Sequence, residues 1–206
     1  LVTPYAYGTL GKVEREYLPF AKSGNNGTFD ADMYLPERWN SYGVEEQAYA
    51  FTETAYEASP LMRTASVTGA GKAWHTAGKS TTTEYGTNAD GEVKLYRVAA
   101  DGTLTASGSY AAGTLETTAT TDEDGHRTCN YTNAEGRTVL AVASGGEERL
   151  ETYYVYDGLG RLCHVLPPEA SHQLATQEGA IDAAVLKRLA YSYTYDRLDR
   201  MGVKQL

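Results

Sequence analysis

The amino-acid sequence predicts a mainly β protein: an antiparallel β-meander with one short C-terminal helix. Three observations predict this fold class. The 206 residues include 17 tyrosines and 21 glycines but only 3 phenylalanines, and tyrosine suits half-exposed strands better than a helical core. Strand-length runs alternate apolar with polar residues along the middle of the chain. Short turns that end in glycine separate these runs, which is typical of hairpins.

The N-terminal part, residues 1–80, is an irregular β and loop region. Its runs VEREYLPF (13–20) and AYAFTETAY (48–56) have the composition of strands. Residues 22–43 include three Gly and three Asn, and they predict a long loop that holds a helical turn.

The central part, residues 81–167, is the predicted β-meander. Its turns are NADG, AADG, DEDG and NAEG, whose last glycine is expected at positive φ. Connections this short predict that each strand pairs with the next one along the chain. The predicted strands include residues 92–98, 103–110, 114–121, 126–132, 137–144, 148–157 and 161–167.

The C-terminal part, residues 168–206, is predicted as a short helix followed by a final hairpin. Asp182 is a suitable N-cap for AAVLKRLA, and Lys187 and Arg188 lie towards the helix C-terminus. A further helical turn near 171–176 stays open as an alternative. We expect the three parts to form one continuous unit that belongs to a longer chain, because the sequence opens on LVTPYAYG without a methionine.

A short pattern recurs along the chain, and internal self-similarity is stronger evidence than any single motif. The fullest copy is YDGLGR at 156–161; further copies are YDRLDR at 195–200, YGTLGK at 7–12 and a longer one at 56–63, with a looser relative at 131–137. The recurring positions are Tyr7, Leu10, Gly11, Lys12, Tyr56, Leu61, Arg63, Tyr156, Asp157, Leu159, Gly160, Arg161, Tyr195, Asp196, Leu198 and Arg200.

Each position in the fullest copy has a folding explanation. We expect Arg161 to lie over the ring of Tyr156 across the mouth of the hairpin. Asp157 can accept hydrogen bonds from turn amides, and Leu159 is expected to enter the apolar layer. Gly160 supplies a positive φ that a side chain would oppose. The motif is therefore predicted to be a recurring corner and not a reactive site.

The segments YVYDGLGRL and YTYDRLDRM resemble the tyrosine-aspartate (YD) repeats of the Rhs family, whose consensus is close to Y-x-Y-D-x-x-G-R-L. The flanking segments, including LVTPYAYGTLGKVEREYLPF and YEASPL, resemble the N-terminal region of large Rhs-type proteins from Bacteroidetes. The chain departs from the pattern at Gly8, Lys12 and Asp199. Asp199 stands at the glycine position, and Asp adopts positive φ more readily than most residues.

The resemblance implies a structural role. Rhs-type proteins, among them bacterial toxin-complex subunits and animal teneurins, coil YD hairpins into a β-sheet spiral that closes as a hollow shell, which commonly encloses a C-terminal effector. The chain is then expected to be a non-enzymatic section of wall in a cell-surface or secreted protein. Its partners would be flanking YD repeats of the same parent chain and an enclosed effector.

Composition argues against two other kinds of partner. The formal net charge is −9 and the basic residues are scattered, whereas nucleic acid needs a concentrated basic surface. No apolar run approaches the length of a membrane span, so this segment is not expected to insert into a membrane.

The sequence offers no catalytic, cofactor-binding or metal-binding motif. The four histidines lack a paired spacing, and Cys163 and His164 are neighbours on a strand, where they point to opposite faces. The acidic turn 122–125 leaves adventitious calcium as an alternative to an ordinary turn. For Cys129 and Cys163 we expect unpaired thiols, with a disulfide as the alternative.

Trp39 and Trp74 support an alternative function. Exposed aromatic side chains on a β-scaffold can stack on sugars, so the chain could be a surface module that binds carbohydrate or another cell through Tyr and Trp. We favour the interpretation that each tryptophan fills a gap under a loop. An enzyme of unrecognised class is a third hypothesis.

Overall fold

A computed structural model describes residues 1–24, 32–43, 45–99, 101–146 and 148–205. Its secondary structure is mainly β-strand, which confirms the predicted fold class. The chain divides into two compact units: residues 1–83 with 121–125, and residues 84–120 with 126–206. No helix in the described part of the chain is long and apolar enough to span a bilayer.

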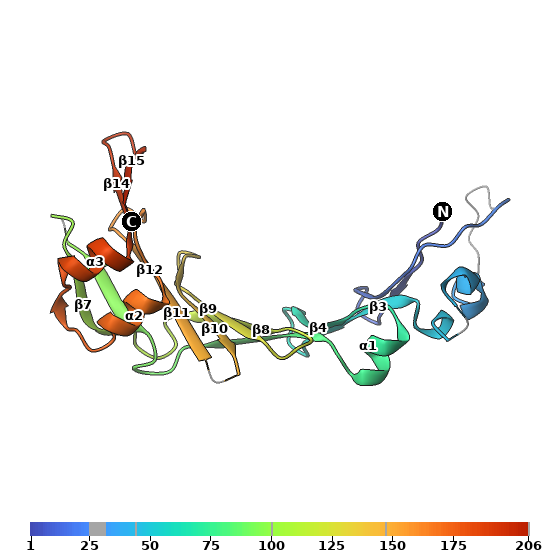
Figure 1. The fold of residues 1–206 in the computed structure, drawn as a ribbon. Coiled ribbons are helices and arrows are strands. Elements are labelled where there is room, and N and C mark those ends of the chain that lie inside the picture. The colour runs from blue at the N-terminus through green and yellow to red at the C-terminus, as the bar shows by residue number, and fades with distance from the viewer. Residues whose placement is uncertain (25–31, 44, 100, 147, 206) are drawn as a thin grey trace. The chain divides into compact units, whose positions relative to one another are not determined.

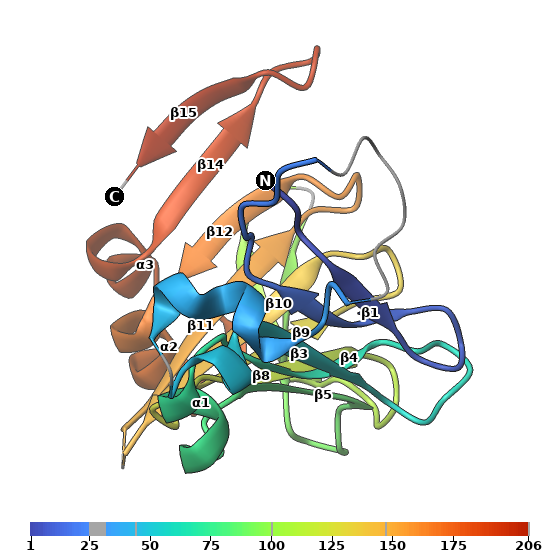
Figure 2. The ribbon, with the colours of Figure 1, turned by 90° about the vertical axis from the view of Figure 1, so that its right-hand side faces the viewer.

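The first unit is built from hairpins and short helical turns. Its strands are β1 (Tyr5–Tyr7), β2 (Val13–Tyr17), β3 (Phe51–Tyr56), β4 (Thr64–Thr68) and the start of β5 (Thr81–Thr87). Its helical elements are η1 (Pro36–Tyr42), η2 (Gln47–Tyr49) and α1 (Lys72–Ala77), and α1 contacts η2 (Figure 2). The helical turn predicted in the loop 22–43 is present as η1, whereas residues 25–31 of that loop lie outside the described residues.

The second unit holds most of the strands. They are β6 (Lys94–Val98), β7 (Leu104–Ser109), β8 (Glu116–Thr121), β9 (Arg127–Thr132), β10 (Thr138–Gly145), β11 (Glu148–Tyr156), β12 (Leu162–Leu166), β13 (Gly179–Ala180), β14 (Tyr191–Tyr195) and β15 (Met201–Gln205). The helices α2 (Pro168–Leu174) and α3 (Ala183–Leu189) contact each other, and α2 also packs on β11 (Figure 1).

The strands pair in two antiparallel sheets. One sheet has twelve strands, in the order β1-β2-β3-β4-β5-β8-β9-β10-β11-β12-β14-β15, and the other has three, in the order β13-β7-β6. Most neighbours are consecutive in the chain, as the short turns predict.

The meander prediction is wrong between residues 88 and 115. The hairpin of β6 and β7 leaves the large sheet, so that β5 pairs with β8 and not with β6. Asn88 closes this excursion: its side-chain oxygen accepts from the N–H of Leu115 at 2.8 Å, and its side-chain nitrogen donates to the carbonyl of Ala111 at 2.9 Å. Asn88 is buried, and these bonds replace the ladder hydrogen bonds that are missing where the chain leaves the sheet.

The displaced hairpin supplies part of the core of the second unit. Leu104 on β7, Leu140 on β10, Leu166 on β12 and Leu174 on α2 are all fully buried in one apolar cluster. A two-stranded hairpin is marginal alone. Packing of β6 and β7 against this cluster buries apolar surface that continued pairing along one sheet would leave exposed.

The first unit has a smaller core. Phe20, Trp39 and Ala50 are buried together, with Tyr17 and Met33 packed against them. The ring of Trp39 stacks on Tyr17 at 5.1 Å between centroids, and its Nε1 donates to the carbonyl of Leu18 at 2.6 Å.

The C-terminal helices differ in part from the prediction. The helix with Asp182 as its N-cap is confirmed as α3, where the Asp182 carboxylate accepts from the N–H of Ala184 at 2.8 Å. A second helix, α2, is also present, and its residues 171–174 lie within the turn near 171–176 that stays open as an alternative to a single helix. Pro168 is the first residue of α2, a position that suits proline because its missing N–H has no helical partner to lose.

Candidate functional site

The repeated corners are the candidate site, and we number them by chain order. The first corner is 7–12, the second 56–63, the third 131–137, the fourth 156–161 and the fifth 195–200. Each closes a hairpin, namely β1–β2, β3–β4, β9–β10, β11–β12 and β14–β15, and each hairpin has a register shift next to its corner.

In the fourth corner, the carboxylate of Asp157 holds the turn. One oxygen accepts from the N–H groups of Leu159 and Arg161 at 3.0 and 2.9 Å, and the other accepts from Nε of Arg161 at 2.7 Å. Partial burial raises the pKa of Asp157, but the hydrogen bonds from Arg161 and Leu159 outweigh it, so the pKa lies below its usual value. The predicted role of Asp157 is therefore present in the structure.

Other corners repeat this arrangement with different acceptors. Asp196 accepts from the N–H groups of Leu198 and Arg200 at 2.8 and 3.0 Å in the fifth corner. In the third corner Asn133 accepts from Arg137 N–H at 2.9 Å, and in the second Glu57 accepts from Arg63 Nε at 2.8 Å. The first corner has Gly8 at this position and closes through backbone bonds alone.

A positive φ recurs at one position of each corner. Gly11, Gly136 and Gly160 have φ of 72°, 76° and 80°, and Asp199 and Met62 take the same position with φ of 58° and 49°. A Cβ at Gly160 would overlap the guanidinium of Arg137, but this end of a flexible side chain can move aside, so the positive φ is the stronger constraint. At the equivalent place in the fifth corner, the carboxylate of Asp199 accepts from Arg161 Nη1 at 2.8 Å.

The predicted contact between Arg161 and Tyr156 is wrong. The guanidinium of Arg161 lies 5.1 Å from the ring of Tyr195, on the next hairpin, and Tyr156 is instead covered by Arg137 at 5.7 Å. The register explains the difference, because Tyr156 pairs with Leu162 and Arg161 is displaced from it by one residue.

This contact recurs, and we call it a junction. In a junction, the basic residue of one corner covers the ring of the tyrosine that begins the corner of the next hairpin. The hydroxyl of the same tyrosine donates to the backbone carbonyl of the residue that follows the basic residue. Three examples are Lys12–Val13 with Tyr56, Arg137–Thr138 with Tyr156, and Arg161–Leu162 with Tyr195.

The junction geometry varies little. The distances from cation to ring centroid are 5.5, 5.7 and 5.1 Å, and the hydroxyl-to-carbonyl distances are 2.7, 3.0 and 2.9 Å, in chain order. At each junction the last strand of one hairpin pairs with the first strand of the next. When this pairing is extended to the corners, the basic residue lies directly opposite the tyrosine. Each junction therefore adds a cation–π contact and a hydrogen bond between neighbouring hairpins.

The leucines of the corners are exposed, so the prediction that Leu159 enters the apolar layer is wrong. Leu10, Leu61, Leu159 and Leu198 have 73%, 69%, 74% and 72% of their surface exposed. They stand at the tips of turns beyond the last paired residues, where no neighbouring strand can cover them.

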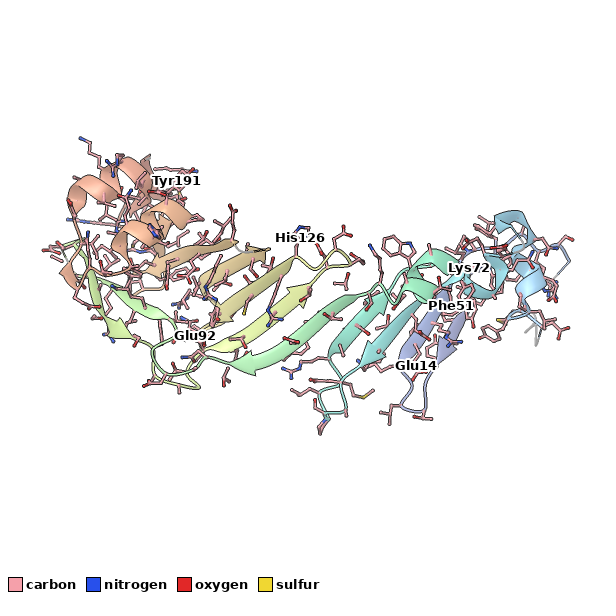
Figure 3. The ribbon with its side chains drawn as sticks, turned by 60° about the horizontal axis from the view of Figure 1, so that its bottom comes forward. Glu14, Phe51, Lys72, Glu92, His126 and Tyr191 are labelled. Atoms are coloured by element: carbon pink, nitrogen blue, oxygen red, sulfur yellow. The ribbon has the colours of Figure 1, made fainter. Side chains whose placement is uncertain are left out.

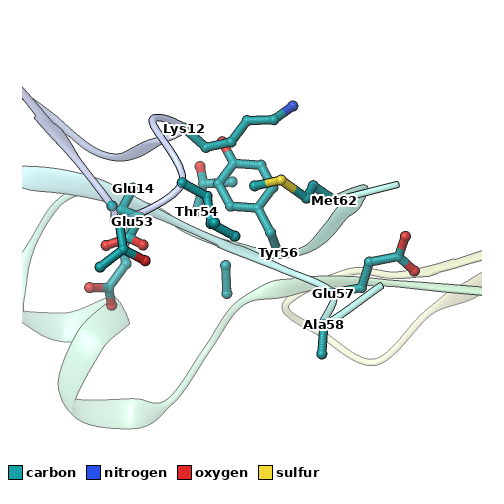
Figure 4. A pocket seen from close by; sticks show the side chains of 12 residues that line it. Lys12, Glu14, Glu53, Thr54, Tyr56, Glu57, Ala58 and Met62 are labelled. Atoms are coloured by element: carbon teal, nitrogen blue, oxygen red, sulfur yellow. The ribbon is translucent and has the colours of Figure 1, made fainter. Parts of the chain in front are cut away.

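A hollow lies beside the first junction. It has a volume of about 480 Å³, and Figure 4 shows Lys12, Tyr56, Glu53 and Met62 around it. The carboxylate of Glu53 pairs with Arg15 at 2.8 Å. The hollow is thus lined by an aromatic ring, apolar atoms and charged side chains. Of the charged side chains, Glu53 is paired with Arg15 and Lys12 covers the ring of Tyr56.

The two tryptophans differ in exposure. Trp39 is only 1% exposed, so neither face of its ring is open to a ligand. Trp74 on α1 is 40% exposed.

The first turn of α1, which carries Trp74, is held by Glu46. The carboxylate of Glu46 accepts from the backbone N–H of Lys72 at 2.6 Å, and Figure 3 shows Lys72 at this end of the helix.

The two cysteines and His164 do not form a reactive group with one another in the described structure. Cys129 on β9 and Cys163 on β12 are free thiols with β10 and β11 between their strands, and three strand spacings of about 4.8 Å exclude a disulfide. Burial raises the pKa of both thiols and lowers that of His164. No group of three potential metal ligands occurs among the described residues.

The acidic turn 122–125 forms contacts within its unit. Asp122 accepts from the N–H of Asp124 at 3.0 Å, Glu123 accepts from the hydroxyl of Thr81 at 2.9 Å, and Asp124 pairs with Lys79 at 3.2 Å. The first contact lies within the turn, and the other two join the turn to Lys79 and Thr81, just before and at the start of β5.

Sequence reasoning missed one buried polar group in the second unit. The hydroxyl of Tyr96 is buried and has no hydrogen-bond partner in the described structure, and burial raises its pKa. It lies beside Tyr153, whose pKa is raised to about 12, at one side of a hollow that Glu151 and Glu178 also line. Nothing in the local sequence marks Tyr96, because its environment depends on the packing of β6 against β11.

Comparison with known proteins finds one match, in the N-terminal part of the chain. Residues 1–87 match a family model described as a domain of unknown function, DUF6443. No curated protein matches the chain.

Proposed function

We propose that the chain is a non-enzymatic structural module of an Rhs/YD-repeat protein that is secreted or held at the cell surface. Its strands would contribute to a shell or an extended sheet that encloses a C-terminal effector. The observation that carries the proposal is the recurrence of one junction at three places between successive hairpins.

The junctions support a structural role because their groups are used within the chain. In the junction at Arg161, the guanidinium covers the ring of Tyr195, and the Tyr195 hydroxyl donates a hydrogen bond to a backbone carbonyl. The carboxylate of Asp157 accepts hydrogen bonds within its own turn. Such a unit links each hairpin to the next without needing a ligand. Hairpins that are marginal alone become stable when neighbours share these contacts.

The resemblance to YD repeats adds the biological setting. The motif YxYDxxGRL at 154–162 is the fullest match, and flanking YD repeats of a parent chain would continue the sheet. Location outside the cell and an enclosed effector rest on this resemblance.

Replacement of the basic residue in each junction tests the proposal. Lys12→Ala, Arg137→Ala and Arg161→Ala should each lower the midpoint of urea unfolding, whereas Arg197→Ala, at an exposed position in the turn of the fifth corner, is the matched control. A structural unit predicts losses at all three positions. If all three variants unfold like the control, the junctions do not stabilise the sheet and the proposal fails.

A second candidate function rests on Trp74. Because this ring is partly exposed on α1, it could stack on a sugar, and the chain would then be a carbohydrate-binding or cell-binding surface module. A glycan array followed by titration calorimetry tests this candidate. Binding that Trp74→Ala removes and Leu35→Ala retains would favour it, and absence of binding across the array would exclude it for the glycans tested.

A further inference from the structure

A hollow in the second unit, which we call the Tyr96 hollow, is lined by polar groups that the three described junctions do not use. It has a volume of about 300 Å³, at the lower end of the range for small-molecule sites. Its walls come from the start of β6, the end of β7, strand β11, and helix α2 with the segment that follows it. The polar side chains that line it include Lys94, Tyr96, Glu151 and Glu178.

The hydroxyl of Tyr96 lacks a partner at this hollow. Tyr96 is only 7% exposed, and its hydroxyl is buried with no hydrogen-bond partner in the described structure. Burial, and then the neighbouring Tyr153, Glu151 and Glu178, raise the pKa of Tyr96. The hydroxyl therefore keeps its proton, and it can donate a hydrogen bond as well as accept one. Because an unpaired buried hydroxyl is costly, a ligand group that pairs with it is favoured.

The ammonium of Lys94 is not available to hold an anion, because its donors are already used. Its Nζ donates to three backbone carbonyls at the end of α2, those of Leu174, Ala175 and Gln177. The same atom pairs with the carboxylate of Glu178 at 3.4 Å. An ammonium group has three donors, and these four acceptors engage all of them. The carboxylates in the Tyr96 hollow would moreover repel an anion.

The carboxylates of the Tyr96 hollow keep acceptor capacity. Glu178 accepts from the N–H of Gly108 at 3.3 Å and lies 3.4 Å from the Lys94 ammonium, and both contacts are long. The Oε2 atom of Glu151 accepts from the Tyr153 hydroxyl at 3.5 Å, which is also long. The hollow therefore combines a hydroxyl that can donate with carboxylate oxygens that can accept.

An alcohol hydroxyl fits this combination, because it accepts from a phenol and donates to a carboxylate at the same time. An ammonium ligand would only donate, and it would lie near the charge of Lys94. We propose that the Tyr96 hollow binds a small neutral polyol of monosaccharide size. One ligand hydroxyl accepts from the Tyr96 hydroxyl, and neighbouring ligand hydroxyls donate to Glu151 and Glu178.

Access to the Tyr96 hydroxyl depends on a lining side chain that moves. The hydroxyl is closed to solvent in the free chain, so a ligand reaches it only after such a movement. The side chain of Glu178 is 62% exposed and its contacts are long, so it can turn aside at little cost. Glu178 then closes on the bound polyol from the solvent side.

Nuclear magnetic resonance of the full chain tests the proposal, with the amide signals of Gly108 and Ser109 as reporters at the wall of the hollow. Polyols at high concentration stabilise proteins without binding, so a saturable shift of these signals is the evidence for binding. The ligands are D-glucose, D-galactose, D-mannose and myo-inositol, each up to ~100 mM, because a few hydrogen bonds hold a small ligand weakly. At least one should give a saturable shift, whereas putrescine and inorganic phosphate should give none.

Tyr96→Phe removes only the unpaired hydroxyl. It should weaken binding by about tenfold and leave the melting temperature of the free chain unchanged or higher, because no hydrogen bond within the chain is lost. Tyr110→Phe is the matched control, since its ring packs against the same core outside the hollow, and it should bind like the wild type. Glu178→Gln should bind more weakly, because an amide offers one acceptor oxygen in place of two.

Four outcomes would overturn the inference: no saturable shift with any of the four polyols, saturable binding of putrescine or phosphate, Tyr96→Phe that binds like the wild type, or Tyr96→Phe that melts earlier. The last would mean that the hydroxyl has a partner in the free chain. Trp74→Ala should leave binding unchanged, because Trp74 belongs to the first unit; a loss of binding in that variant would place the polyol at Trp74 and also overturn the inference. The unfolding test of the junctions is independent of all these results.

Discussion

Arg161 lies 5.1 Å from the ring centroid of Tyr195, a residue of the next hairpin, while its Nε donates to Asp157 of its own corner at 2.7 Å. One side chain therefore stabilises a turn and joins two hairpins. Arg161 can do both because its guanidinium carries donors in a fixed plane, whose edge serves the carboxylate while its face meets the ring. Lys12, which faces Gly8 in its corner, retains only the contact to the next ring.

Removal of one hydroxyl should show what a junction contributes. Tyr156→Phe keeps the ring under Arg137 but loses the hydrogen bond to the Thr138 carbonyl at 3.0 Å. We expect the free energy of unfolding to fall by about 0.5–1.5 kcal/mol, because the carbonyl is left without that partner. Urea unfolding followed by circular dichroism measures it. Tyr154→Phe, on the same strand, is the control, and equal losses in both variants would contradict the assigned role.

The sequence allowed the corner to be predicted but not the junction. The spacing of Asp157, Gly160 and Arg161 lies within one turn, and the turn geometry follows from those residues alone. The partner of Arg161 depends on which strand comes next and in what register. The segment between corners differs in length at every junction, so no fixed spacing connects Arg161 to Tyr195 or Lys12 to Tyr56.

Two further errors have the same origin. An alternating pattern predicts a strand but not its neighbour, so β6 and β7 were assigned to the large sheet although they pack over it as a separate hairpin. Leu159 was assigned to the apolar layer because leucine is usually buried. Its turn places it beyond the paired residues, and composition carries no information about that position.

Substitution of the positive-φ glycine tests the corner geometry. Gly160→Val should lower the free energy of unfolding by about 1–3 kcal/mol, because a β-branched residue is strained at a φ of 80°. Gly160→Asp should cost less, since Asp199 occupies the same position in the fifth corner with a φ of 58°. Thermal melts measure the order of the variants.

Gly158 offers a matched control in the same turn. A Cβ at this position meets no atom within 4 Å, and Gly158 has no positive φ. Gly158→Val should therefore change the melting temperature little. Equal losses for Gly158→Val and Gly160→Val would show that the corner does not depend on the conformation of residue 160.

The second corner should confer a pH dependence on stability. Hydrogen bonds from the Arg63 side chain and then from Ser59 lower the pKa of Glu57 from its ordinary value of 4.5 to about 2. A folded-state pKa below the unfolded value gives stability that is fully present above pH 4.5 and is lost as the pH falls towards 2. Glu57→Gln should lose this contribution at neutral pH and show a shallower fall in melting temperature on acidification.

Melts of the wild type and Glu57→Gln at a series of pH values down to 2 provide the measurement. Glu135→Gln, at the tip of the third corner, is the control, because no contact of its carboxylate to a basic group is seen in the described structure. If the wild type and Glu57→Gln differ by the same amount at every pH, the lost contact is not an ionised one and the assignment to Arg63 is wrong.

Asn88 should determine whether the β6–β7 hairpin stays closed. Asn88→Ala leaves the buried N–H of Leu115 without its side-chain partner, whereas the exposed Ala111 carbonyl keeps its hydrogen bond from the Thr114 hydroxyl, and we expect a loss of about 1–3 kcal/mol. Asn88→Asp keeps an acceptor for Leu115 but turns a carboxylate oxygen towards the carbonyls of Ala89 and Ala111 at a buried position, so it should cost at least as much. Asn130→Ala, at an exposed position of β9, is the control.

Hydrogen exchange should locate the effect of Asn88→Ala, with faster exchange of the Leu115 amide and little change at Asn133. Unchanged exchange at Leu115 in Asn88→Ala would mean that core packing alone, through Leu104 and its neighbours, holds the hairpin over the sheet.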